Sequence, residues 1–157
     1  MDILVDEHRQ FLRLLLVHDV KFILIGGYAV IYHGYERLTG DMDIWLEPDN
    51  DNRKRLLTAL AAFGIEDEDV KRVAETNFTE PQVFFIGKVP RRIDFLTRIT
   101  GVDFNEAIEK VNFFFMQEYK IPVIHYHHLL ASKKNTGRLK DEADIEELQR
   151  INKYKNE

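Results

Sequence analysis

Hydrophobic positions along the chain recur at spacings that predict an alternation of helices and strands. Residues 3–18 carry apolar side chains at helical spacing, which predicts an amphipathic helix at the start of the sequence. Short apolar runs at 21–25 and 42–46 have the length of buried strands. The remaining pattern predicts helices over 28–33, 49–64, 66–75, 104–111, 127–135 and 140–151, and strands over 83–86, 93–99, 112–119 and 121–125.

This order of elements predicts an α+β fold, with a mixed β-sheet and helices packed mainly on one face of it. The strands over 83–86 and 93–99 flank a loop with Gly87 and Pro90, which is typical of an antiparallel hairpin. The sequence contains no internal repeat, low-complexity run or linker. Residues 1–157 are therefore expected to form a single domain, long enough to bury a core without disulfides.

Composition and charge narrow the classes of function. Hydrophobic residues make up 45% and charged residues 31% of the chain, as in ordinary globular proteins. A formal net charge of −5 disfavours a protein that coats nucleic acid, because such binding depends on neutralising phosphates. No cysteine is present, so disulfides and thiolate metal sites are excluded. The acidic N-terminus and the short apolar runs predict a cytoplasmic protein with no membrane partner.

Two aspartates follow a glycine turn and are separated by a single residue. Gly26 and Gly27 end the first predicted strand, where the backbone can turn sharply or approach a ligand closely. Asp41 and Asp43 lie at positions i and i+2 of an extended segment, so their side chains point to the same face. Carboxylates held together repel each other, and Mg²⁺ is a common reason to tolerate this. The alternative is a pair of solvent-facing aspartates, which is common for this short pattern.

A third carboxylate stands in a later predicted strand. Asp94 lies between Ile93 and Phe95, and a buried aspartate is costly unless it is paired or bound to a metal. Coordination of one cation by Asp41, Asp43 and Asp94 would explain why all three interrupt apolar strands. Because strand faces alternate, Asp94 is equally compatible with an exposed position on an edge strand.

Together these motifs resemble the polymerase-beta-type nucleotidyltransferase superfamily, and in particular its small members similar to AbiEii-type toxin nucleotidyltransferases. A second stretch over 129–145 is also similar, so the resemblance covers roughly residues 20–150. One position departs from the more familiar pattern, which has serine where this chain has Gly27. The residues that carry the resemblance are Gly26, Gly27, Arg37, Thr39, Asp41, Asp43 and Asp94.

The resemblance implies a nucleotidyltransferase-like sheet and Mg²⁺-dependent transfer of a nucleoside monophosphate from an NTP to an acceptor hydroxyl. It implies that Asp41, Asp43 and Asp94 are catalytic and hold two Mg²⁺ ions, with Mn²⁺ as a substitute. The acceptor stays open among a tRNA end, a protein and a small molecule. An antitoxin or other partner protein is also implied. The nucleotide would be bound by Gly26, Gly27, Arg37, Thr39 and Lys133.

Several of these residues have a second interpretation. Arg37 is expected near the site, with either the substrate or a carboxylate as its partner. Lys133 and Lys134 together are equally typical of a solvated helix face. Asp141 is expected to cap the last helix, and Asp144 to face the site or pair with Arg138.

Two further classes of function compete with the enzyme. The absence of a serine hydroxyl at Gly27 favours a non-catalytic binding or regulatory module with the same fold. His125, His127 and His128 raise the alternative of a zinc site, but no nearby Cys or Glu completes a ligand set. Histidines bound by hydrogen bonds are the more ordinary interpretation of that cluster.

Overall fold

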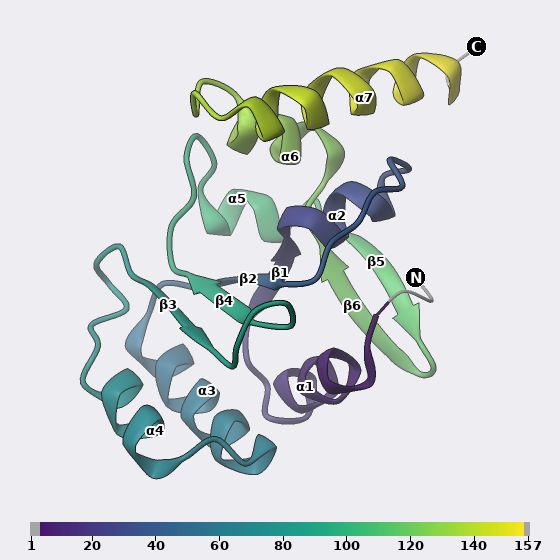
Figure 1. The fold of residues 1–157 in the computed structure, drawn as a ribbon. Helices are drawn as coiled ribbons and strands as arrows, with labels where there is room; N and C mark the ends of the chain where they lie inside the picture. The colour runs from purple at the N-terminus through teal and green to yellow at the C-terminus, as the bar shows by residue number, and fades with distance from the viewer. Residues whose placement is uncertain (1–3, 156–157) are drawn as a thin grey trace.

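The computed structural model describes residues 4–155, so the first position of the predicted opening helix, residue 3, lies outside the described residues. Within that range the chain forms an α+β fold, as the hydrophobic pattern predicts (Figure 1). Its elements are α1 (Asp6–Val17), β1 (Phe22–Ile25), α2 (Gly26–Tyr32), β2 (Met42–Leu46), α3 (Asn50–Phe63), α4 (Asp67–Ala74), β3 (Val83–Ile86), β4 (Ile93–Leu96), α5 (Phe104–Ile108), β5 (Asn112–Met116), β6 (Tyr119–Val123), α6 (Tyr126–Lys133) and α7 (Leu139–Lys155).

The strands form one mixed six-stranded sheet in the order β3-β4-β2-β1-β6-β5. The predicted hairpin is present as the antiparallel pair of β3 with β4, and β5 pairs with β6 in the same way. In the centre, β1 runs antiparallel to β2, while β2 pairs with β4 and β1 with β6 in parallel. The sheet is therefore mixed because its two central strands each take one parallel neighbour.

Helices α1, α3 and α4 pack on one face of this sheet (Figure 1). Phe11 of α1 meets Phe95 of β4 edge to face, with ring centroids 5.8 Å apart. Phe84 of β3 stacks on the same Phe95 ring at 4.9 Å. These contacts extend the core from the helix layer to the edge of the sheet.

On the other side, the helices gather around the end of β1. Helix α2 continues directly from β1, and α6 and α7 lie beyond it (Figure 1). Trp45 of β2 meets Phe104 of α5 edge to face at 5.2 Å. Edge residues on this side stay exposed, among them Phe85 of β3 and Phe115 of β5. The site described next lies between this less covered side and the C-terminal helices.

The buried apolar residues form one continuous cluster that runs from Leu4 to Leu148. Three central strands, β1, β2 and β4, contribute their apolar residues to it. None of the helices in residues 4–155 combines the length and apolar character needed to cross a membrane.

Candidate functional site

The two glycines after β1 leave room for side chains from the β2 side of the site. Gly26 has φ +68°, and a Cβ there would overlap the Asp43 carboxylate. A Cβ at Gly27 would overlap the hydroxyl of Thr39. Both glycines belong to the first turn of α2, which starts two residues before the predicted helix. Thr39 thus fills the space that a side chain at position 27 would occupy.

The three predicted aspartates lie around one pocket. Asp43 on β2 and Asp94 on β4 are register partners on neighbouring parallel strands, so they share a face of the sheet. Asp41 comes just before β2 and joins them in lining a pocket of about 430 Å³, together with Gly27, Thr39 and Lys140. We call this the carboxylate pocket. Strand alternation predicted that Asp41 and Asp43 share a face, whereas the place of Asp94 beside them was implied by the family resemblance.

Asp43 carries the electrostatic cost of this arrangement. Burial, which is the largest cause, and the neighbouring charges of Asp94 and Asp41 together raise the pKa of its carboxyl group to about 6. The positive charges of Lys133 and Lys140 act in the opposite direction. A group of like charges in a buried position is relieved by a cation, which supports the predicted affinity of this place for a divalent ion.

Arg92 contacts two of the three carboxylates, those of Asp41 and Asp94. Its backbone N–H donates to Oδ1 of Asp41 at 2.9 Å. Its Nε lies 2.8 Å from Oδ1 of Asp94 without the alignment of a hydrogen bond, and its Nη2 donates to Oδ2 at 3.4 Å. The guanidinium group also lies 4.7 Å from the centre of the Phe85 ring. Arg92 therefore acts as a counter-ion for Asp94.

The donor chemistry of the pocket fits Mg²⁺, since the cation prefers carboxylate oxygens. In residues 4–155, however, no three His, Asp or Glu side chains are arranged as a ready metal site. Arg92 contacts two of the three aspartates instead, Asp41 through its backbone N–H and Asp94 through its guanidinium group. Binding of a metal by all three aspartates therefore requires the side chains of Asp94 and Arg92 to separate.

Arg37 and Lys133 meet in a buried group of ion pairs. Arg37 donates from Nε and Nη2 to the two carboxylate oxygens of Asp144, at 2.9 and 3.0 Å. Lys133 Nζ lies 3.0 Å from Asp144 and 3.1 Å from Asp141. The Asp144 side chain is only 2% exposed, so this bidentate pairing satisfies a buried charge. The partner of Arg37 is thus a carboxylate of α7.

Asp141 organises the start of α7. It lies in the first turn of this helix, which begins at Leu139, so the prediction that it caps the helix is wrong. Its oxygens accept hydrogen bonds from Thr136 at 2.8 Å and from Lys133 at 3.1 Å, and Arg138 lies 3.2 Å away. Burial alone would raise its pKa, but these hydrogen bonds and charges lower it below the usual value. Arg138 thus pairs with Asp141, and Asp144 is left to Arg37 and Lys133.

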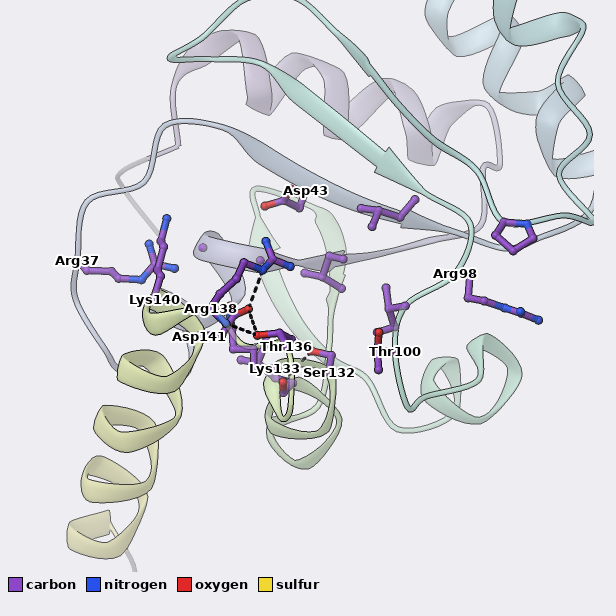
Figure 2. A pocket seen from close by; sticks show the side chains of 17 residues that line it. Arg37, Asp43, Arg98, Thr100, Ser132, Lys133, Thr136, Arg138, Lys140 and Asp141 are labelled. Atoms are coloured by element: carbon purple, nitrogen blue, oxygen red, sulfur yellow. Dashed lines mark hydrogen bonds and ion pairs between the residues drawn. The ribbon is translucent and has the colours of Figure 1, made fainter.

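Beside the carboxylate pocket lies a second pocket of about 550 Å³, which we call the basic pocket (Figure 2). Gly26, Gly27, Asp43 and residues of α6 and α7 contribute to its walls. The two pockets share Gly27, Asp43 and Lys140. Five cationic side chains line the basic pocket: Arg37, Arg98, Lys133, Arg138 and Lys140.

The histidines lie at the start of α6, away from the residues that line these pockets. His125 is the N-cap residue, and its Nδ1 accepts a hydrogen bond from the backbone N–H of His127 at 3.1 Å. His125 therefore helps to begin α6.

A comparison with protein-family models identifies the chain. Residues 5–157 match a family described as nucleotidyl transferase of unknown function (DUF2204). The chain belongs to this family. The expected membership among nucleotidyltransferases is thereby confirmed, and the match covers both pockets of this nucleotidyl transferase. No curated protein matches the chain.

Three cations that line the basic pocket, Arg98, Arg138 and Lys140, were missing from the sequence-based site, where Arg138 was expected only as a partner of Asp144. Lys140 directly precedes Asp141, in a stretch already noticed for its resemblance to the superfamily, so its place in the sequence was a usable signal. Arg98 follows β4 in a segment where no motif stands out. All the residues predicted for nucleotide binding line at least one of the two pockets: Gly26, Gly27, Arg37, Thr39 and Lys133.

Proposed function

We propose that the protein is a cytoplasmic enzyme that binds an NTP with Mg²⁺ and transfers its nucleoside monophosphate to an acceptor hydroxyl, releasing pyrophosphate. One observation carries this proposal. The half-buried carboxylate of Asp43, together with Gly27 and Lys140, forms the common wall of a pocket lined by five cations and a pocket lined by two further aspartates. A triphosphate needs the first environment and its divalent ion needs the second.

The basic pocket would hold the nucleotide. Its volume of about 550 Å³ falls within the range of about 300–1,000 Å³ that is usual for small-molecule sites. Backbone groups at Gly26 and Gly27 can approach a phosphate closely, because neither residue has a Cβ. Phosphoryl transfer depends mainly on positioning and charge neutralisation, and a cation-rich wall supplies both.

The carboxylate pocket would hold the metal and admit the acceptor. Asp41, Asp43 and Asp94 are the residues that would bind Mg²⁺, with Mn²⁺ as a substitute, and a bound metal there neutralises charge on the reacting phosphate. Asp94 lies at the β4 side and, once free of Arg92, would accept the proton of the attacking hydroxyl. The acceptor oxygen then bonds to the α-phosphorus, and the bond from that phosphorus to the pyrophosphate oxygen breaks.

The finer resemblance extends this proposal to a biological setting. Similarity to AbiEii-type toxins favours a component of a toxin–antitoxin pair, with an antitoxin as the protein partner. The acceptor would then be a tRNA end, a protein hydroxyl or a small molecule. Labelled NTP incubated with each class of acceptor, followed by detection of transferred label, distinguishes these three.

A second candidate rests on the Arg92–Asp94 ion pair. Arg92 neutralises the charge of Asp94, and position 27 holds glycine instead of the superfamily's serine. With these two features, the same fold would serve as a non-catalytic module that binds a ligand or partner protein. In that case the basic pocket binds nucleotide without a divalent ion, and no label is transferred to any acceptor.

Calorimetric titration of each NTP with Mg²⁺ tests the proposal. Wild-type protein should bind at least one NTP in a metal-dependent way, and Asp43→Asn should lose the dependence on metal. Asp51→Asn is the matched control, because Asp51 lies on α3 with its side chain 83% exposed. Metal-independent binding in the wild type supports the binding module. No binding of any NTP at millimolar concentration contradicts the enzyme and leaves the module that binds a partner protein.

A further inference from the structure

The cations of the basic pocket differ in what they already bind. Arg37 and Lys133 are held by Asp144, and Lys133 and Arg138 by Asp141. Within residues 4–155, neither Arg98 nor Lys140 has a carboxylate within ion-pair distance. These two side chains are the ones that can bind an anion without first leaving a partner.

Arg98 and Lys140 differ in where they lie. Lys140 lines both the basic pocket and the carboxylate pocket, whereas Arg98 lines only the basic pocket. Figure 2 shows Lys140 beside Arg37 at the start of α7, and Arg98 at the opposite side of the pocket near Thr100. The charge of Lys140 is also close enough to Asp43 to lower the pKa of that carboxyl group. Lys140 thus lies where a ligand passes from one pocket to the other.

Lys133, the lysine expected to reach the phosphates, is poorly suited to do so alone. Its side chain is 11% exposed and its ammonium group lies 3.0 and 3.1 Å from two carboxylates. Moving it onto a phosphate would leave buried Asp144 with Arg37 as its remaining cation, and separating a buried ion pair is costly. Lys140, in contrast, is exposed and carries three donors on a flexible stem.

We propose that Lys140 is the side chain that binds the triphosphate at the junction of the two pockets, and that Lys133 is a positioning residue. Lys133 links α6 to α7 through Asp141 and Asp144, and Lys140 directly precedes Asp141. The buried ion pairs therefore fix the place from which Lys140 extends. This assignment rests on the proposed function, because it requires that a nucleotide occupies the basic pocket.

Binding of three ligands tests the assignment: the NTP that wild-type protein binds most tightly, its nucleoside, and inorganic tripolyphosphate, each with Mg²⁺. Lys140→Gln should weaken the NTP and tripolyphosphate roughly tenfold, the usual size for a charge-assisted contact, and leave the nucleoside unchanged. Lys140→Arg should retain most of the affinity. The control is Lys134→Gln, an exposed lysine that lines neither pocket and should bind all three as the wild type does.

Thermal unfolding separates binding from positioning. Lys140→Gln should unfold at the wild-type temperature, while Lys133→Gln should unfold at a lower one because two carboxylates lose a partner. If Lys140→Gln binds the NTP as tightly as Lys134→Gln while Asp43→Asn loses metal-dependent binding, the assignment is wrong and the proposed function stands. If wild-type protein binds neither NTP nor tripolyphosphate, both the proposed function and the assignment of Lys140 to the triphosphate are wrong.

Discussion

Asp43 is the residue at which the needs of the fold and of the site oppose each other. Its carboxyl pKa is about 6 in the folded protein, against an ordinary value of 3.8, because it is buried next to two other carboxylates. A raised pKa means that the folded state binds the proton more tightly than the unfolded state does. Stability from this group is therefore fully present below about pH 3.8 and is lost as the pH rises through about 6.

Asp43→Asn should therefore stabilise the metal-free protein at pH 8. A shift from 3.8 to about 6 corresponds to about 3 kcal/mol, or roughly 6–12 °C in the midpoint of thermal unfolding for a chain of this size. The gain should shrink as the pH falls from 8 toward 5, which scanning calorimetry in EDTA would measure. Asp51→Asn should change the midpoint little at either pH, and a destabilised Asp43→Asn variant would contradict the account.

Gly27 offers a second test at the scale of one residue. The superfamily's more familiar serine cannot be restored here, because any Cβ at position 27 overlaps Thr39. Gly27→Ser should cost about 1–3 kcal/mol, the usual range for overpacking, as measured by urea unfolding. Adding Thr39→Gly should recover much of that loss. If Gly27→Ser alone is as stable as the wild type, the two positions do not compete for space.

These residues show what a sequence can say about a site. Strand alternation predicted that Asp41 and Asp43 share a face, but it left Asp94 open, and the register that brings Asp94 beside Asp43 comes from the folded sheet. Alternation could not supply the partner of Arg37, since Asp144 is 107 positions away and only the folded chain brings them together. Spacing along the sequence also could not show that Lys133 forms ion pairs with Asp141 and Asp144 while Lys140 is left to bind a ligand. That difference depends on how α6 packs against α7.

At the scale of elements, one group of ion pairs connects the loop before β2 with α6 and α7. Arg37 comes from that loop, Lys133 from the last turn of α6, and Asp144 from α7. The basic pocket lies between these segments and the sheet, so its shape depends on this connection. The strands were predicted mainly within a few residues of their ends, but this packing is non-local and was not predicted.

Breaking the connection should be costly. Arg37→Met leaves buried Asp144 with a single cation and should lower the free energy of unfolding by about 2–4 kcal/mol. Arg150→Met is the matched control, because Arg150 forms an exposed ion pair with Glu147 on the same helix and its loss should cost at most about 0.5 kcal/mol. Equal effects of the two substitutions in chemical unfolding would show that burial of the Arg37 pair does not matter.

At the scale of the whole molecule, the core is continuous from α1 to α7. Leu4 before α1, the central strands and Leu148 of α7 all belong to one buried cluster. A single cluster of this kind is the physical basis of cooperative unfolding, because no group of elements has a core of its own. The sequence indicated this through the absence of linkers and repeats.

Unfolding should therefore be a single transition. Circular dichroism and tryptophan fluorescence should give the same midpoint, since Trp45 lies in the middle of the sheet and contacts α5. The heat-capacity change should be about 2 kcal/mol/K, as expected for one domain of 157 residues. Two separate transitions would contradict the prediction that residues 1–157 form one domain.

The separation of Arg37 and Asp144 along the chain also determines the order in which the parts of the site are synthesised. During synthesis, Asp41 and Asp43 leave the ribosome about a hundred residues before α7 does, which is a delay of roughly 5–20 s at ordinary rates of translation. Throughout that interval the cations of α6 and α7 are missing from the site. A nascent chain therefore carries Asp41 and Asp43 before the cations of α6 and α7, and the basic pocket is completed only when the final helices dock.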